Sequence, residues 1–460
     1  MNLIYNKAHS WSEQRASFWI ILGLALIVCV CGFVGGVYIE LARGGAVVAL
    51  ASKVIVELRD GQKRFLTSPL FLLSVIGVLF FSVVQGIWAP QPPWPTSERN
   101  IALYVGSKAE AVVLAFCMAA LMFYQVMSIK IGAEKLILVS NQSNFLVYFL
   151  FLMTLSISAF DIGIYYLKIS GFEVPTLFSK SHFVVPPLLI LSLCFLIRNS
   201  LISGWVCKIC LFFLVGAVLV GLIYVGESKV AVFIMASLLL YVFRLFDFSF
   251  RNLIVISLIS LLVVLSLLQV VQNMRWKVSV VPDQISTKYS EIFIGKGVRR
   301  QTETGYCLGH VIKIHAQEPF EMSEHFFWVK GLIPRAFWPN KPNLSLGKEY
   351  AMKYCSRRTF EIGHHSASIT LLGQPIIKGG IWGLVFHVGI LLFALAIVET
   401  FNANRAALST TLVVALLPWL IDFDQDFAMY VANAVKFTLV MLILFVPMVL
   451  IEHYNGAMRK

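Results

Sequence analysis

The chain has 460 residues, of which 58% are hydrophobic and only 13% are charged, and its mean hydropathy is +0.81. Soluble domains contain about 25% charged residues, so this composition excludes a soluble globule. The sequence lacks the short alternating strands of a membrane barrel, and a backbone in lipid must otherwise satisfy its hydrogen bonds as helix. We therefore predict an all-α polytopic membrane protein. Although the net charge is +13, we do not expect nucleic acid to be a partner of such a protein.

Apolar runs of about 20 residues, long enough to cross a hydrocarbon core of about 30 Å, recur along the chain. The predicted spans are 18–38, 69–88, 110–129, 143–167, 183–199, 205–226, 229–246, 252–272, 376–399, 406–421 and 431–452. A shorter run at 45–57 carries Lys53 and either lies on the membrane surface or forms a twelfth crossing.

The placement of cations favours the crossing, because short cytoplasmic loops collect Lys and Arg. If 45–57 crosses, the cations of 59–64 and 130–135 share the cytoplasmic side, while the cation-poor 89–100 and 422–427 face outward. We expect about twelve spans (11–13), with both termini in the cytoplasm. The chain then divides into N-terminal membrane helices (1–272), one large outward loop (273–375) and C-terminal membrane helices (376–460).

The outward loop 273–375 is unusually cationic. It contains 14 Lys and Arg against 8 acidic residues, a net charge of +6, and five of the nine histidines. Such a surface either faces anionic lipid head groups or binds an anionic substrate. Short amphipathic helices are expected at 320–333 and 346–358. Cys307 and Cys355 both lie in this loop, where they either form a disulfide or remain free.

The loop contains the proline-rich stretch "GLIPRAFWPNKPNLSLGKEY" (331–350). Arg335, Trp338 and Lys341 follow one another at three-residue spacing, which places side chains on one side of a polyproline or 3₁₀ backbone. A guanidinium and an ammonium on a stiff segment suit a phosphate, and an indole suits a sugar face. The alternative is a Pro-Trp segment that only holds the loop to the bilayer.

Three segments resemble a known family. "IPRAFWPNKP" (333–342) is similar to a stretch of the Wzy-type O-antigen and oligosaccharide repeat-unit polymerases of bacteria. "TLLGQPIIKGGIWGLVF" (370–386) resembles their return into the membrane, with Gln374 where a glutamate is expected. "GESKVAVFIMASLLLYVF" (226–243) resembles their short outer turn, with Lys229 where an arginine is frequent.

The resemblance implies a metal-independent, multi-helix (GT-C-like) glycosyltransferase of the bacterial inner membrane. Such a polymerase joins oligosaccharide repeat units carried on undecaprenyl diphosphate at the periplasmic face. It moves the growing chain from its lipid carrier to the sugar of the next unit with inversion, without a cofactor. Expected partners are the lipid-linked oligosaccharide, membrane lipid and a chain-length regulator protein. The alternatives are an O-antigen ligase, which uses the same chemistry, and a flippase or secondary transporter of an anionic substrate.

This chemistry assigns roles to particular residues. Without a metal, Arg and Lys must stabilise the departing diphosphate; the candidates are Arg275, Arg299, Arg300, Arg335 and Lys341. Trp338, Arg357 and Arg358 are expected to contact sugar or lipid, although the two arginines also suit a helix end. His364 and His365 are the candidate general bases, because histidine titrates near neutral pH.

The segment "DFDQDF" (422–427) contains three alternate acids, Asp422, Asp424 and Asp426. A metal site there is less favoured than a solvated cap. The preferred interpretation is that one acid orients an acceptor hydroxyl or pairs with an arginine of the loop.

Overall fold

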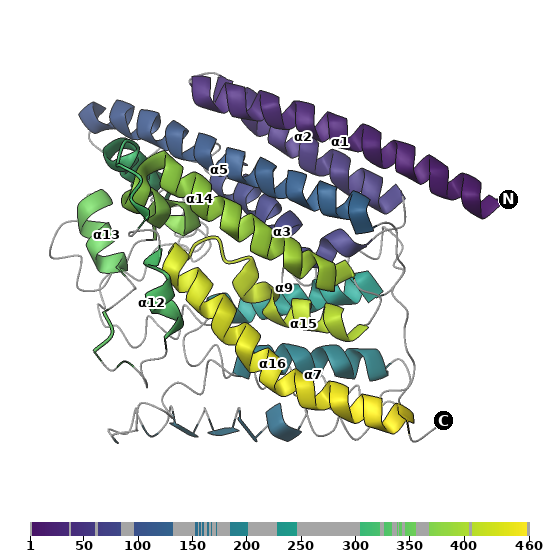
Figure 1. Cartoon of the computed structure of the whole chain (residues 1–460). Helices are drawn as coiled ribbons and strands as arrows, with labels where there is room; N and C mark the ends of the chain where they lie inside the picture. Colours follow the sequence, from purple (N-terminus) through teal and green to yellow (C-terminus); the bar gives the residue numbers. More distant parts are fainter. Residues whose placement is uncertain are drawn as a thin grey trace, which may run out of the picture. The chain divides into compact units, whose positions relative to one another are not determined.

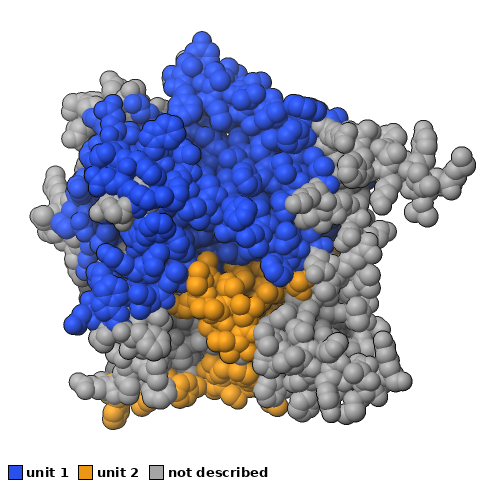
Figure 2. Space-filling model, viewed as in Figure 1, with its two compact units in different colours: residues 1–135, 288–403, 419–433 blue, residues 136–287, 404–418, 434–460 orange. Residues whose placement is uncertain are grey.

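The structure is a computed structural model of the chain, and the part that it describes is helical (Figure 1). The described residues are 2–35, 38–59, 63–83, 96–131, scattered residues between 152 and 172, 185–200, 228–245, 304–322, 326–333, 338, 340–342, 346–355, 368–403 and 407–457. Among them there is no strand. The chain forms two compact units, shown in Figure 2: residues 1–135, 288–403 and 419–433 form unit 1, and residues 136–287, 404–418 and 434–460 form unit 2.

Unit 1 contains the longest helices. Its elements are α1 (Asn2–Val34), α2 (Tyr38–Arg59), the 3₁₀ helix η1 (Arg64–Thr67), α3 (Pro69–Ile76), the π-helix η2 (Gly77–Val83), α5 (Thr96–Ile131), a helix at 304–315, α12 (Val329–Leu332), α13 (Gly347–Tyr354) and α14 (Thr370–Ala403). Unit 2 contains α7 (Val185–Ser200) and α9 (Ser228–Leu245), which contact each other. Most of α15 (Ala407–Leu420) and α16 (Phe427–Ala457) belongs to unit 2, while the turn between these two helices belongs to unit 1.

Three described helices are long and apolar enough to cross a membrane: Ala16–Val34, Lys108–Ile129 and Thr370–Ala403. Shorter apolar helices occupy Pro69–Leu79, Phe233–Leu245, Ser409–Leu420 and Phe427–Ile443. The predicted all-α chain with helices of membrane length is therefore confirmed for the described residues. The spans predicted at 205–226 and 252–272 lie outside these residues, as does most of 143–167.

Close helix packing in unit 1 depends on small residues. Figure 1 shows α1, α2 and α5 side by side, and each pair is in contact. Gly77 marks the approach of α3 to α5, because a Cβ at this position would lie 2.2 Å from the sulfur of Cys117. Ser74 of α3 donates to the Cys117 carbonyl at 2.9 Å. A side chain at Gly77 would therefore have to displace the sulfur of Cys117.

A buried ion pair joins α2 to α5. Arg43 binds the Glu110 carboxylate through two nitrogens, with 2.6 Å from Nη2 to Oε2. Ser82, in the π-helical turn η2, donates to Glu110 Oε1 at 2.5 Å. The carboxylate thus receives donors from two elements, as a charge with only 2% of its side chain exposed requires.

A second polar cluster, named here the η1 cluster, lies where α2, η1, α5 and α14 meet. Lys53 pairs with Glu57 at 2.6 Å, and its ammonium lies 5.2 Å from the centre of the Tyr124 ring. Arg64 donates to Ser128 of α5 at 2.7 Å and lies 5.7 Å from the same ring. Every one of these side chains is buried.

The η1 cluster continues to the last turns of α14. Ser68 is the N-cap of α3: its hydroxyl accepts from Phe71 N at 3.1 Å and donates to Glu399. Asn402 donates to Glu399 at 3.2 Å and accepts from Thr67 at 2.9 Å. The cluster contains two cations, Lys53 and Arg64, and two carboxylates, Glu57 and Glu399, so its formal charge is balanced.

These contacts fix the direction of the long helices within unit 1. The last turns of α5 and α14 both reach η1, while Leu371 at the start of α14 donates to Phe423 O at 3.2 Å. The Phe423 ring packs against Phe116, three turns before Ser128 in α5. Hence α5 and α14 are parallel. We name the two ends of unit 1 the η1 end and, where α14 begins, the disulfide end.

Candidate functional site

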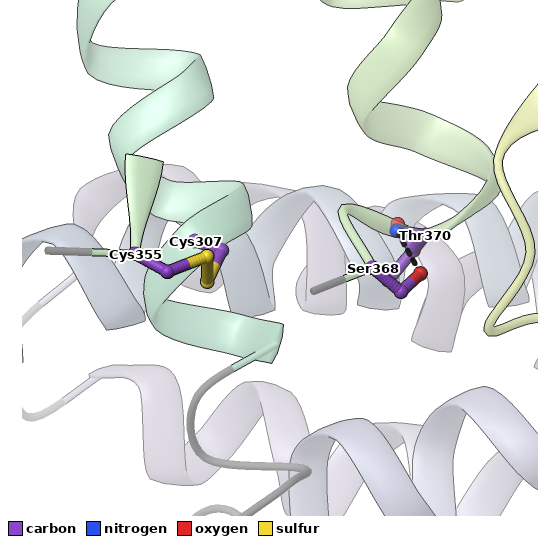
Figure 3. Close-up of a disulfide and its surroundings, with 4 residues drawn as sticks. All are labelled: Cys307, Cys355, Ser368 and Thr370. Atoms are coloured by element: carbon purple, nitrogen blue, oxygen red, sulfur yellow. Dashed lines mark hydrogen bonds between the residues drawn. A yellow bond between two sulfur atoms is a disulfide. The ribbon is translucent and has the colours of Figure 1, made fainter. Parts of the chain in front are cut away.

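A disulfide between Cys307 and Cys355 joins the helix at 304–315 to the residue after α13, which settles the question that the sequence left open (Figure 3). The two cysteines are 48 residues apart. Closing a loop of this length stabilises the folded state by about 4 kcal/mol in a chain-entropy model. The covalent bond therefore holds two parts of the predicted outward loop together.

A histidine strengthens the same junction. His315 Nε2 shares a hydrogen bond of 2.9 Å with the Tyr354 hydroxyl, and Nδ1 lies 3.1 Å from Glu318 Oε1. His315 and Tyr354 are buried beside the disulfide. This histidine positions α13 against the helix at 304–315.

The loop also packs against a break in α14. Gly379 and Gly380 have non-helical backbone angles, and Gly380 has φ +58°, which favours glycine. A Cβ on Gly380 would lie 2.8 Å from Ala316 O and 2.7 Å from Glu318 O. Ile381 N donates to Ala316 O at 3.2 Å. The backbone of the loop therefore packs closely against the break. The first turns of α14, before the break, form a separate short helix.

The turn 421–426 between α15 and α16 meets the start of α14. Ser368 donates to Asp424 O and accepts from Thr370 N at 3.1 Å, a contact drawn in Figure 3. Thr370 has φ +64°, which is uncommon for a β-branched residue and indicates local strain. Gln425 donates to Asp422 Oδ2 at 2.6 Å and accepts from Asn433 at 3.1 Å. A network of backbone and side-chain hydrogen bonds thus fixes the acidic turn.

Asp426 is an acid of this turn that combines burial with an unsatisfied carboxyl oxygen. Only 8% of the residue is exposed, and Oδ1 has no hydrogen-bond partner among the described residues. Burial raises the pKa of Asp426 to about 7, with a further increase from the charge of Asp424, while the backbone N–H of Ile369 opposes the shift. A carboxyl group with this pKa exchanges its proton near neutral pH, as a general acid or base must.

Gln374 connects the acidic turn to α13. Its Oε1 accepts from Ala428 N, at the start of α16, at 2.9 Å, and its side chain also hydrogen-bonds to the phenol of Tyr350. Burial raises the pKa of Tyr350 above its usual range, and the nearby charge of Asp426 raises it further. Tyr350, Gln374 and Asp426 therefore form one site at the disulfide end of unit 1, named here the Asp426 site.

An amide suits position 374 better than the glutamate that the family resemblance leads one to expect. The amide accepts from Ala428 with its oxygen and still has an NH₂ group for Tyr350. A carboxylate would offer Tyr350 no donor and would place another negative charge near Asp426.

The proline-rich stretch is described in part. Lys341 Nζ donates to Gly331 O at 2.9 Å and to Ile333 O at 2.8 Å, and its backbone N–H donates to Trp338 O at 3.1 Å. Two of its three ammonium donors thus bind carbonyls at the end of α12. Diphosphate binding by Lys341 stays a prediction, as does sugar contact by Trp338, which is half-buried.

The short helices of the loop differ in extent from those predicted. Over 320–333, the α-helix is limited to Val329–Leu332, and 323–325 lie outside the described residues. Over 346–358, the helix is α13, Gly347–Tyr354. The remaining predicted site residues all lie outside the described part: Arg275, Arg299, Arg300, Arg335, Arg357, Arg358, His364 and His365.

Sequence reasoning did not single out the Asp426 site. It found the acidic turn but could not choose among the three acids, and it gave no role to Tyr350. One signal in the sequence could have pointed to the acidic turn. Ser368, which binds this turn, follows the His364–His365 pair by only a few residues. Among the described residues, no group of three or more His, Cys, Asp or Glu side chains is arranged to hold a metal ion.

Comparison of the chain with protein-family models, with curated proteins and with solved structures finds no match.

Proposed function

We propose that this chain is a membrane glycosyltransferase that joins lipid-diphosphate-linked oligosaccharide repeat units, with its active site at the disulfide end of unit 1. The observation that carries the proposal is Asp426, a buried carboxyl group with an unsatisfied oxygen and a pKa near neutrality. It lies at the base of a loop that is rich in cations by sequence. Glycosyl transfer from a diphosphate requires a proton acceptor for the attacking hydroxyl and cations for the leaving group. Asp426 would supply the first, and the sequence of the loop offers the second.

In the proposed reaction, a hydroxyl of the next repeat unit attacks the anomeric carbon of the growing chain. The bond from that carbon to the diphosphate oxygen breaks as the new glycosidic bond forms, with inversion. The hydroxyl proton passes to Asp426, and cations of the loop stabilise the charge of the leaving diphosphate. His364 and His365, four and three residues before Ser368, are the second candidates for the base.

A twelve-span topology fits the directions of the helices. The 22 residues of α2 (Tyr38–Arg59) extend about 33 Å, enough to cross the hydrocarbon core, and α2 packs along α1 and α5. Because α5 and α14 are parallel, the chain between them must cross an odd number of times. The five spans predicted from 143 to 272 meet this condition.

The disulfide supports an outward placement of the disulfide end. Disulfides persist in oxidising compartments such as the bacterial periplasm and are rare in the cytosol. Cys307 and Cys355 form such a bond in the segment that the charge pattern places outside. The η1 end, with Arg59 and Lys63 beside it, would then face the cytoplasm, as the distribution of cations favours.

The test is reconstitution of the purified full chain into liposomes with an undecaprenyl-diphosphate-linked repeat unit, followed by gel separation of the products. We expect a ladder of lengths from the wild type, loss of the ladder in Arg335→Ala, and an unchanged ladder in the exposed-cation control Lys330→Gln. Single transfer to a lipid A core without a ladder would indicate a ligase. Movement of the intact lipid between leaflets without transfer would indicate a flippase, and either result would overturn the proposal.

A further inference from the structure

Unit 1 contains an apolar groove between α2 and the η1–α3 segment, far from the Asp426 site. Its volume is about 330 Å³, within the range of about 300–1,000 Å³ for ligand sites. The lining side chains are all apolar: Val47, Leu50, Ala51 and Val54 of α2, Phe65 and Leu66 of η1, and Phe71, Leu72, Val75 and Leu79 beyond it. Such a groove has no hydrogen-bonding group to hold water and suits a hydrocarbon chain.

The groove is elongated along the helices. From Val47 to Val54, α2 rises about 10 Å, and from Phe71 to Leu79 the facing segment covers about 12 Å. Val47 and Leu79 lie away from η1, and both side chains are substantially exposed, at 39% and 43%. The groove is thus a slot that is open to the surroundings of unit 1, rather than an internal void.

Cations gather at one end of this slot. Arg59 ends α2 with its side chain exposed, and Lys63 is the N-cap of η1. Lys63 lies at the edge of the groove, since its carbonyl accepts from the lining residue Leu66 at 3.2 Å. The third cation of the segment 59–64, Arg64, is buried in the η1 cluster and bound to Ser128, so Arg59 and Lys63 are the two cations considered for the slot. At the opposite end of α2, Arg43 pairs with Glu110 and Glu40.

We propose that this groove binds one hydrocarbon chain of an anionic phospholipid, whose phosphate is held by Arg59 and Lys63. The apolar lining selects the chain, and the cations at the η1 end select the head group. A phospholipid is favoured over the diphosphate carrier because the cations lie at the end of unit 1 opposite to the Asp426 site. This inference requires that unit 1 spans a membrane, and its choice of a phospholipid over the diphosphate carrier rests on the proposed function.

The experiment is native mass spectrometry of the detergent-purified full chain, titrated with phosphatidylglycerol or with phosphatidylcholine of identical acyl chains. We expect one tightly retained phosphatidylglycerol, bound about tenfold more strongly than phosphatidylcholine. The double variant Arg59→Gln/Lys63→Gln should lose this preference. A control with the same loss of charge at the other end of unit 1, Lys330→Gln/Lys348→Gln, should keep it.

A second pair of variants tests the groove itself. Ala51→Phe fills the slot from its exposed side and should abolish binding of both lipids. Val48→Phe adds the same ring to the neighbouring, non-lining position of α2 and should leave binding unchanged. Thermal unfolding of all variants checks that each is folded. Equal affinity for the two lipids, insensitivity to Ala51→Phe, or displacement of phosphatidylglycerol by equimolar undecaprenyl phosphate would overturn the proposal.

Discussion

The two ends of unit 1 treat buried charge in opposite ways. At the η1 end, Lys53, Glu57, Arg64 and Glu399 are buried with two charges of each sign. At the disulfide end, Asp426 is almost as deeply buried, yet it forms no ion pair with any described residue. Both arrangements place ionisable groups out of water, where an isolated charge is costly.

This difference separates a structural role from a chemical one. A cluster that is balanced in formal charge joins four elements of unit 1, so its loss should be seen in stability. A carboxyl group with an unsatisfied oxygen and a pKa near 7 is not satisfied by the fold alone. Perturbed pKa values of this kind cluster at functional sites. The comparison predicts that substitutions at the two ends will affect different measurements.

The largest expected effect is on activity, at the disulfide end. Asp426→Asn keeps the size of the side chain but cannot accept a proton, so polymerisation should fall about 10³-fold. The thermal stability of the variant at pH 8 should equal or exceed that of the wild type, because a buried charge has been removed. Ladder formation in liposomes measures the first effect and thermal unfolding the second.

The exposed carboxylate Glu321 provides the control for this substitution, and Glu321→Gln should leave the ladder intact. Full activity in Asp426→Asn would show that the base lies elsewhere, and His364 and His365 would be the next residues to substitute.

At the η1 end the expected effect is on stability. Lys53→Met leaves Glu57 buried without its partner, which should destabilise the protein by about 3–5 kcal/mol. The double variant Lys53→Met/Glu57→Met removes both charges and should recover most of this loss. Chemical or thermal unfolding in detergent measures the coupling. If the double variant lost as much stability as the sum of the single variants, the pair would not act as a unit.

The pKa of Asp426 gives opposite pH dependences for activity and stability. As a base, the carboxyl group works only when ionised, so the rate should rise with pH through about 7. The folded state holds this proton more tightly than the unfolded chain, where the pKa is near 3.8. The stabilisation is therefore complete below pH 3.8 and is lost as the pH rises through 7.

Each unit of pKa shift corresponds to about 1.4 kcal/mol, so the melting temperature of the wild type should decrease measurably between pH 5 and pH 8. Asp426→Asn should reduce this slope. An equal slope in the wild type and the variant would assign the titration to another group.

Within the described residues, several predicted spans coincide with helices, because a membrane span is a local property of the sequence. The predicted spans 110–129 and 229–246 lie within or coincide closely with α5 and α9, and composition alone determines such segments. Sequence reasoning also named Cys307 and Cys355 as one pair but left open whether they form the disulfide that the structure has. The break at Gly379–Gly380 was visible as a glycine pair, but its role in receiving Ala316 and Glu318 was not, because that contact joins distant segments.

The choice among Asp422, Asp424 and Asp426 could not be made from the sequence. All three lie in one short turn with the same local pattern, and they differ only in what the fold places around them. Gln425 binds Asp422, whereas the site of Asp426 is completed by Tyr350 and Gln374 from elements far away in the chain. Burial in the folded protein raises the pKa of a carboxyl group, and no local sequence pattern shows which of the three acids is buried in this way.

The smallest expected effect tests how the η1 end satisfies its carboxylates. Ser68 both caps α3 and donates to Glu399, so Ser68→Ala removes two contacts of one hydroxyl. Loss of an N-cap costs about 1 kcal/mol, and weaker support of a buried carboxylate adds to it. Ser68→Thr should recover part of the loss, because it retains the hydroxyl.

Ser74→Ala, which removes a hydroxyl that bonds only to backbone carbonyls, is the matched control and should cost less. Equal losses in unfolding experiments on the two alanine variants would mean that Glu399 does not depend on Ser68. The remaining donor from Asn402 would then be sufficient for the carboxylate, and the balance of charge in the η1 cluster would matter more than its individual hydrogen bonds.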